Sequence, residues 1–154
     1  MSLLGKTAPE FTLFDGSRKP VTLSAFRGKS VVVAFIPASF TGVCEKELCK
    51  FRDSLSVLNE INADVLGISV DSPFANAAFG RKNEFGFPLL SDYTRKTVAD
   101  YGVSHENFVD LPGYTAAKRS VFIVNPDGVI VYEWIAPTPQ TEPNYDEIQK
   151  FLEG

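Results

Sequence analysis

The sequence predicts an α/β fold, in which a central mixed sheet is flanked by helices. Three continuous apolar runs, at residues 30–36, 63–70 and 120–124, are rich in β-branched side chains, as strands buried on both faces are. Helical patterns follow the first two runs, which indicates a parallel-containing sheet with helices packed on it. A turn at 125–128 and a further strand at 129–135 follow the third run, so an antiparallel hairpin closes the sheet.

The N-terminal residues predict a small β extension. Residues 11–14 alternate as a short strand that ends at the turn pair Asp15-Gly16, and residues 21–23 can pair back with it as a hairpin. Residues 24–28 follow as a single helical turn, with a serine N-cap and a glycine stop.

The helix after the first buried strand is expected to start near Cys44. Pro37 ends that strand, because proline cannot donate a hydrogen bond to the sheet ladder. The apolar side chains of the helix recur at spacings of four and three residues and predict one stripe that faces the core. These side chains are Cys44, Leu48, Phe51, Leu55 and Leu58, and residues 59–64 close the helix.

Further helices are indicated later in the chain. Asp71-Ser72-Pro73 favours a helix start with proline at the first position. The expected buried side of this helix comprises Phe74, Ala77, Ala78 and Phe79. The remaining predicted elements are an extended piece at 87–90, a helix at 93–101 stopped by Gly102, and a last helix at 144–152. Residues 103–117, which hold the only histidine, His105, lack clear periodicity and receive no assignment.

This order of elements is that of a thioredoxin-like fold with an N-terminal β extension, and we expect one domain over residues 1–154. The 15 basic and 19 acidic side chains give a net charge of −4 and form no basic stripe, which argues against nucleic acid as a partner. We find neither a signal-peptide pattern nor an apolar stretch long enough to span a bilayer. We therefore expect a cytoplasmic protein with no membrane partner.

Cys44 is expected where a buried strand leads into the first turn of a helix. Unpaired backbone N–H groups and the positive end of the helix dipole lie at such a position and favour the thiolate, the nucleophilic form of cysteine. The two cysteines are too few for a disulfide scaffold, so they are expected to have a chemical role. With one histidine they match no zinc pattern, and we expect no metal.

The spacing P-x-x-x-T-x-x-C, formed by Pro37, Thr41 and Cys44, resembles that of the peroxiredoxins, which are cofactor-free thiol peroxidases. An arginine that opens the third buried strand, Arg119, strengthens the resemblance. Further segments resemble the family in family order, so the resemblance covers about residues 5–152; these segments are 70–73, 87–92 and 119–124.

The sequence combines features of two subgroups of that family. Cys49 lies five residues after Cys44, as in the Q type (bacterioferritin comigratory protein-like), in which the second cysteine resolves the first. Residues 40–44 together with Glu47 resemble instead the E-type alkyl hydroperoxide reductases, which use one cysteine. The resemblance implies dimers for the E type, for which Phe40 and Phe74 are plausible exposed contacts, and often monomers for the Q type.

The resemblance implies reduction of hydrogen peroxide and organic hydroperoxides, in which the Cys44 thiolate attacks one peroxide oxygen and the other leaves. Arg119 would keep the thiolate charged and donate to sulfur and peroxide in a fixed fork. The Thr41 hydroxyl would contact the peroxide oxygens, and Pro37 would shield the sulfur from water. Glu47 would accept from the active-site arginines and hold Arg119 in place. A thioredoxin-like protein would be the reductant.

Two other functions are compatible with such a fold. A thioredoxin-type thiol–disulfide oxidoreductase uses C-x-x-C beside a tryptophan, whereas the spacing here is C-x-x-x-x-C and the only tryptophan is Trp134. In a non-catalytic binding module, Cys44 and Cys49 would be incidental, since a buried free cysteine behaves as a small hydrophobe. Arg119 could likewise be a simple ion-paired arginine, and Glu47 a carboxylate favoured by the helix dipole.

Helix geometry sets a condition on any disulfide between Cys44 and Cys49. Residues five apart in a regular α-helix have Cα atoms about 8.6 Å apart. A disulfide usually needs less than about 7 Å. We therefore expect that the helix start must unwind before Cys49 can attack a Cys44 sulfenic acid. The alternative is that Cys49 is incidental and an external thiol resolves the sulfenic acid.

Overall fold

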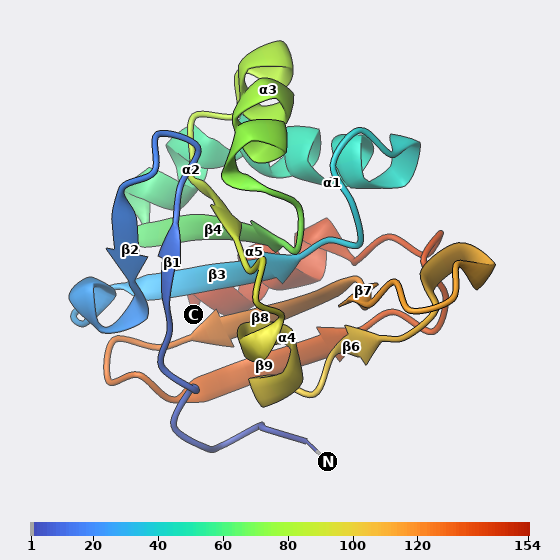
Figure 1. The fold of residues 1–154 in the computed structure, drawn as a ribbon. Helices are drawn as coiled ribbons and strands as arrows, with labels where there is room; N and C mark the ends of the chain where they lie inside the picture. The colour runs from blue at the N-terminus through green and yellow to red at the C-terminus, as the bar shows by residue number, and fades with distance from the viewer. Residues whose placement is uncertain (1) are drawn as a thin grey trace.

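The computed structural model describes residues 2–154 and has a seven-stranded mixed sheet at its centre (Figure 1). In spatial order its strands are β2 (Pro20–Thr22), β1 (Thr12–Phe14), β5 (Leu89–Ser91), β4 (Ala63–Ser69), β3 (Ser30–Phe35), β8 (Ser120–Val124) and β9 (Ile130–Ile135). β4 pairs in parallel with β3 and β5, and all other pairs are antiparallel. The predicted mixed sheet, closing hairpin and N-terminal β extension are confirmed. The sequence did not indicate that β1 would join the sheet through β5.

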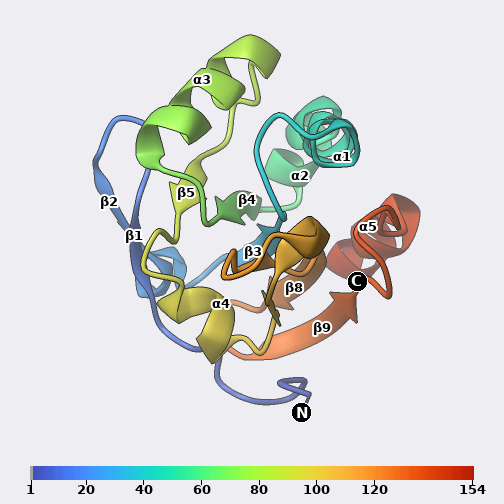
Figure 2. The ribbon, with the colours of Figure 1, turned by 45° about the vertical axis from the view of Figure 1, so that its right-hand side comes forward.

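Helices cover both faces of the sheet (Figures 1 and 2). The helical elements are η1 (Leu23–Phe26), α1 (Gly42–Asp53), α2 (Leu55–Glu60), α3 (Pro73–Asn83), α4 (Lys96–Asp100), η2 (Phe108–Asp110) and α5 (Tyr145–Glu153). Alternate residues of β3 belong to two separate apolar clusters, one on each face of the sheet. Val32 and Ala34 pack with buried side chains of α1, α2, α3 and α5, whereas Val33 and Phe35 pack with those of α4 and residues 103–117. β3 is therefore buried on both faces, as its sequence predicts.

The predicted helix after β3 is present but divided. α1 begins at Gly42, and Ser54, with ψ near 1°, separates it from α2. Serine favours such a break because its side chain competes for backbone hydrogen bonds. The expected stripe holds for Cys44, Leu48, Phe51 and Leu58, which are all buried, while the side chain of Leu55 lies outside the described part of the structure.

α3 starts as predicted, but its buried side is different. The Ser72 hydroxyl accepts a hydrogen bond from the Ala75 N–H at 3.1 Å, and Pro73 is the first helical residue. The expected burial of Phe74 is wrong, since its side chain is 65% exposed. The buried stripe runs instead through Asn76, Phe79 and Asn83, at spacings of three and four residues. Two buried asparagines are tolerated there because each makes hydrogen bonds.

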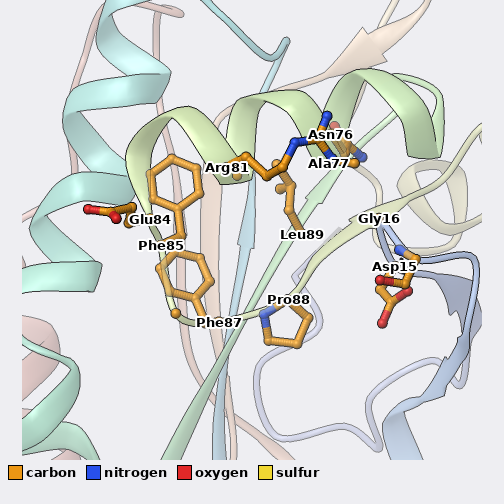
Figure 3. Close-up of a pocket in the computed structure, with 13 residues that line it drawn as sticks. Asp15, Gly16, Asn76, Ala77, Arg81, Glu84, Phe85, Phe87, Pro88 and Leu89 are labelled. Atoms are coloured by element: carbon orange, nitrogen blue, oxygen red, sulfur yellow. Dashed lines mark hydrogen bonds between the residues drawn. The ribbon is translucent and has the colours of Figure 1, made fainter.

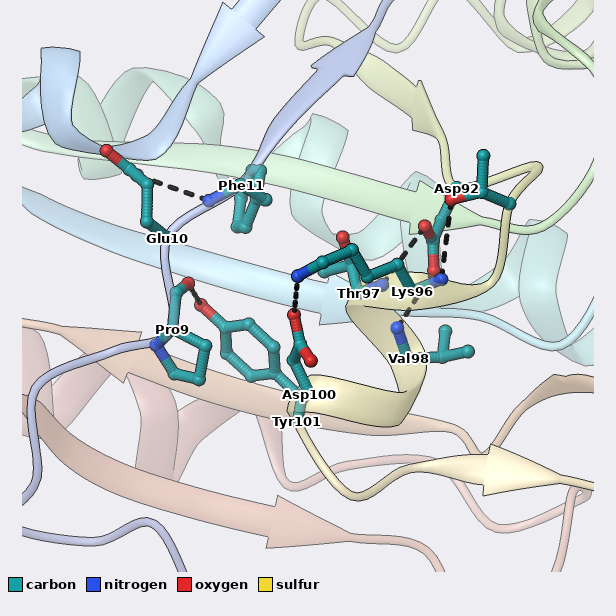
Figure 4. A network of polar contacts seen from close by, with 10 residues as sticks. Pro9, Glu10, Phe11, Asp92, Lys96, Thr97, Val98, Asp100 and Tyr101 are labelled. Atoms are coloured by element: carbon teal, nitrogen blue, oxygen red, sulfur yellow. Dashed lines mark hydrogen bonds and ion pairs between the residues drawn. The ribbon is translucent and has the colours of Figure 1, made fainter.

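α4 is shorter than the predicted helix over 93–101, and it depends on a buried carboxylate (Figure 4). Asp92 is fully buried and accepts hydrogen bonds from the N–H groups of Thr97 and Val98 at 3.2 and 2.8 Å. These are N–H groups of a first helical turn, which have no partner within a helix. Gly102, with φ +69°, follows the helix as predicted.

The segment left unassigned from sequence, 103–117, forms a small second sheet. β6 (Ser104–His105) pairs antiparallel with β7 (Ala116–Ala117), and η2 lies between them. Strands of two residues are too short to leave a periodic pattern in the sequence. This segment carries the chain to β8 and so places Arg119 beside the end of β3.

Asp92→Ala should lower the free energy of unfolding by about 2–4 kcal/mol, because two buried N–H groups lose their acceptor. Urea unfolding followed by circular dichroism would measure this loss. Asp100→Asn on the same helix is the matched control. It removes an exposed ion pair with Lys96 and should cost no more than about 1 kcal/mol. Equal effects of the two variants would contradict the capping role of Asp92.

Candidate active site

The structure brings Cys44 and Arg119 together at the carboxyl end of β3. Cys44 lies in the first turn of α1 and is fully buried. Arg119 directly precedes β8, which pairs with β3, and its Nη2 donates a hydrogen bond to the Cys44 Sγ at 3.1 Å. A guanidinium beside the sulfur stabilises the thiolate form. The strand pairing therefore explains how two residues 75 apart in sequence meet.

Glu47 completes a buried, hydrogen-bonded triad with them. It lies one turn after Cys44 on α1 and accepts a hydrogen bond from Arg119 Nη1 at 2.9 Å. Its carboxylate is fully buried, and its Oε2 has no hydrogen-bond partner among residues 2–154. Burial raises the pKa of Glu47 to about 7, against the opposing attraction of Arg119. The pKa of Arg119 is raised as well, because the effects of Cys44 and Glu47 exceed the effect of its own burial.

The loop between β3 and α1 carries the other two predicted residues. Pro37 is buried just after the strand end, and Thr41 is the exposed N-cap residue of α1. The Thr41 hydroxyl donates to the Ala38 carbonyl at 2.8 Å and makes no capping bond to the helix. This bond occupies the hydroxyl proton and leaves the oxygen lone pairs free to accept. Phe40 adopts φ +64° and is 51% exposed.

A polar network that sequence reasoning missed fixes this loop. The Ser39 N–H donates to Asp71 Oδ2 at 2.7 Å, and the Ser39 hydroxyl donates to Asn76 Oδ1 at 2.8 Å. Asn76 is buried and also accepts from Ser69 and donates to the Leu90 carbonyl. The loop is thereby bound to β4, α3 and β5. The sequence indicates Asp71 only as part of a helix start and of a segment that resembles the family.

Cys49 lies on the flank of α1 that faces α3. Its side chain is half-buried, and its Sγ donates to Asn83 Oδ1 at 3.7 Å. Asn83 in turn donates to the Phe79 carbonyl, and its own carbonyl accepts from Arg52. Both cysteines are free thiols. Cys49 is therefore on the same helix as Cys44 but has a different set of partners.

The loop between β9 and α5 also reaches the site, which the sequence did not indicate. Arg119 Nε donates to the Pro139 carbonyl at 2.9 Å, so all three nitrogens of its guanidinium have a partner. In the same loop Glu142 forms an ion pair with Lys46 of α1 at 3.0 Å. Tyr145 at the start of α5 donates its hydroxyl to Glu142 at 2.7 Å.

The surface hollows of about 680 and 580 Å³ are not lined by Cys44 or Arg119. A groove of about 580 Å³ runs between α3 and the turn after β1, with the stacked rings of Phe85 and Phe87 on one side (Figure 3). Neither Cys44 nor Arg119 lines it. A smaller cavity of about 350 Å³ is lined by Arg119, His105 and Lys118 together with the residues after β9. His105 and Arg119 thus line the same cavity.

Within residues 2–154, no group of three or more histidine, cysteine, aspartate or glutamate side chains is placed to hold a metal ion. None of the described helices is both long and apolar enough to cross a membrane. The site itself contains a buried sulfur beside a guanidinium whose three nitrogens all donate hydrogen bonds.

Comparison with known proteins shows which family this chain is similar to. The profile of the AhpC/TSA family matches residues 4–133. The chloroplastic peroxiredoxin Q of Sedum lineare is 40% identical over 150 residues, which cover 97% of this chain and 77% of that protein. The similarity therefore spans both cysteines and Arg119.

Solved structures agree. The crystal structure of peroxidoxin BcpB from Mycobacterium tuberculosis matches with a TM-score of 0.87 and 29% identity, over 99% of this chain and 97% of that one. A structure of peroxiredoxin Q from Xanthomonas campestris matches with a TM-score of 0.82 and 27% identity, over 93% and 89% of the two chains. These matches favour the peroxidase over the thioredoxin-type oxidoreductase.

Glu47 predicts a pH dependence of stability. Its pKa is raised in the folded state, so the folded protein binds more protons than the unfolded chain between pH 4.5 and about 7. The contribution of Glu47 to the free energy of unfolding should therefore fall as the pH rises through this window. Glu47→Gln should flatten that fall in denaturant titrations at several pH values.

The matched control is Glu45→Gln, two residues earlier on the same helix, where the carboxylate is partly exposed and pairs with Lys82. It should leave the slope of stability against pH close to that of the wild type. A Glu47→Gln slope as steep as the wild-type slope would show that burial does not raise the pKa of Glu47.

Proposed function

Because this chain belongs to the AhpC/TSA family and is a Q-type peroxiredoxin, a thiol peroxidase, we propose that Cys44 is the residue that reduces the hydroperoxide. The observation that carries this assignment is the 3.1 Å hydrogen bond from Arg119 to the Cys44 sulfur. Cys49 is bonded to a neutral amide and lacks a comparable cation within hydrogen-bond distance among the described residues. Cys44 is therefore the better-activated nucleophile.

The reaction follows from these groups. The Cys44 thiolate attacks the terminal oxygen of ROOH, the S–O bond forms as the O–O bond breaks, and the alkoxide leaves and takes up a proton to give ROH. The sulfur is oxidised to a sulfenic acid and the peroxide is reduced. Arg119 stabilises the thiolate and the negative charge that develops on the departing oxygen. Glu47 acts through Arg119, because it fixes the orientation of the guanidinium from the opposite side.

Thr41 and Pro37 prepare the peroxide's place. The Thr41 hydroxyl donates to Ala38, so its oxygen accepts the hydrogen bond that a hydroperoxide donates. Pro37 keeps water from the sulfur, which strengthens the electrostatic interactions there. Cys44 is fully buried, so a hydroperoxide reaches the sulfur when this loop moves aside.

Cys49 completes the cycle as the resolving thiol. It attacks the Cys44 sulfenic acid, a disulfide forms, and water is released. In the intact α1 the two cysteines are five residues apart, so their Cα atoms are about 8.6 Å apart and the start of the helix must unwind first. A thioredoxin-like protein then reduces the disulfide. This cycle requires a reducing compartment, for which we propose the cytoplasm.

A homodimer is proposed through the face around Phe40 and Phe74. Both side chains are large, apolar and more than half exposed. Phe40 lies in the loop between β3 and α1, and Phe74 lies in the first turn of α3. Phe40 packs on Phe79 with ring centroids 5.0 Å apart, which would hold it in place as a contact. Sedimentation of the wild type against Phe74→Ser tests the proposal, and two equal monomeric profiles would refute it.

Cys44→Ser should abolish peroxide reduction, because the serine hydroxyl is a poor nucleophile toward ROOH at neutral pH. Consumption of hydrogen peroxide by the reduced protein in a stopped-flow instrument would measure this. Cys49→Ser is the matched control and should still consume one equivalent. Residual activity of Cys44→Ser above roughly a hundredth of the wild-type rate would refute the assignment.

Arg119→Lys should be severely impaired although it keeps the positive charge. The guanidinium contacts sulfur, Glu47 and Pro139 at once, and a single ammonium cannot reproduce these three directions. The second-order rate constant with peroxide is the measurement. If lysine preserves it, Arg119 has only a structural role.

One equivalent of peroxide should leave the wild type two hydrogens lighter, as the mass of an intramolecular disulfide requires. Cys49→Ser should instead gain one oxygen and then stall or overoxidise. Amide exchange over residues 44–52 should rise in the oxidised wild type, because an unwound turn loses its protection. A stable gain of one oxygen in the wild type would favour resolution by an external thiol.

A further inference from the structure

The turn between the two cysteines is attached to the rest of the protein at consecutive positions. Glu45 pairs with Lys82 of α3 at 3.3 Å, Lys46 pairs with Glu142 at 3.0 Å, and Glu47 bonds to Arg119. Cys49 bonds to α3 through Asn83. Three separate elements therefore hold the residues whose unwinding the disulfide requires.

The ion pair of Lys46 differs from the other contacts because its partner, Glu142, is itself bound by a further residue. Glu142 accepts a second hydrogen bond, from the Tyr145 hydroxyl at 2.7 Å, on its other carboxylate oxygen. The Tyr145 ring packs edge-on against Phe51, with centroids 5.7 Å apart. Lys46 and Phe51 both belong to α1. Glu142 in the loop before α5 and Tyr145 at the start of α5 therefore hold this helix at two points.

The ionisation states of Glu142 and Tyr145 favour these contacts at neutral pH. The hydrogen bond from Tyr145 lowers the pKa of Glu142, against the effect of partial burial, and Lys46 adds to the lowering. Burial and the bond to Glu142 raise the pKa of Tyr145, so its hydroxyl stays a donor. Glu142 is therefore ionised and bound on both sides at neutral pH.

From this arrangement we infer that Lys46, Glu142 and Tyr145 are positioning residues that hold α1 in its wound form and so limit the rate at which Cys49 resolves the Cys44 sulfenic acid. The inference rests on the proposed resolution by Cys49. None of the three residues touches the sulfur. They act by favouring the helix in which Cys44 meets Arg119 over the unwound turn in which it meets Cys49.

Lys46→Met and Glu142→Gln each remove the ion pair. Lys46 is 64% exposed, so the pair contributes as an exposed one does, and disulfide formation should become about two- to fivefold faster. The double variant should be no faster than either single variant, because both remove the same contact. Lys46→Arg keeps the positive charge and should form the disulfide at the wild-type rate.

The rate is measured on the reduced protein mixed with one equivalent of hydrogen peroxide, quenched in acid and analysed by intact mass. Consumption of the first equivalent should be unchanged, since Cys44 and Arg119 are untouched. At excess peroxide the variants should accumulate less sulfinic acid, because resolution competes with a second oxidation.

The melting temperatures of the reduced and the disulfide forms distinguish this role from a merely structural contact, which would affect both forms equally. Lys46→Met should lower the melting temperature of the reduced protein and leave that of the disulfide form unchanged, because the contact is already broken there. The matched control is Lys96→Met on α4, which removes an exposed ion pair at 2.6 Å far along the chain from α1. It should leave the rate of disulfide formation at the wild-type value.

Two results would overturn the inference: an unchanged rate in both Lys46→Met and Glu142→Gln, or an equal loss of melting temperature in the two redox forms. The mass of the wild type by itself shows whether Cys49 resolves the sulfenic acid. If it does not, the wild type gains one oxygen and does not lose two hydrogens. That result precedes any comparison of variants and refutes both proposals.

Discussion

The buried guanidinium of Arg119 is the group on which the rest of the site depends. A buried cation is costly unless every direction is matched, and removal of one partner leaves an uncompensated charge. Here the sulfur of Cys44, the carboxylate of Glu47 and the carbonyl of Pro139 each take one nitrogen. Three segments must therefore keep their relative positions: the start of α1, the start of β8 and the loop after β9. A shift of any one of them leaves a buried charge without its partner.

The sequence predicts the parts of this arrangement that follow from local pattern. Continuous apolar runs of β-branched residues predict β3, β4 and β8, and the proline after β3 predicts where the strand ends. The strand-to-helix passage predicts a cysteine at a helix N-terminus. The family resemblance adds Arg119 and Glu47, which the structure places in contact.

What the sequence does not predict depends on contacts between distant residues. The buried side of α3 holds Asn76 and Asn83 in place of Phe74, because partners on the active-site loop, β4, β5 and α1 satisfy their amides. The anchoring of Ser39 by Asp71 and the approach of Glu142 to Lys46 are of the same kind. Pairs of this sort leave no periodicity, so single-sequence reasoning has no signal for them.

The distance in sequence between Cys44 and Arg119 has a consequence for biosynthesis. A ribosome that has made the first hundred residues has released the cysteine but not the arginine 75 positions later, nor the glutamate at 142. Contacts between residues so far apart in sequence also form late in folding, because closing a long loop costs entropy before the contact contributes favourable free energy. The nascent chain therefore carries Cys44 without its guanidinium partner, and the pair forms only when the polypeptide is nearly complete. If Cys44 is the reactive residue as we propose, synthesis under oxidative stress thus proceeds without an activated sulfur on an unfinished chain.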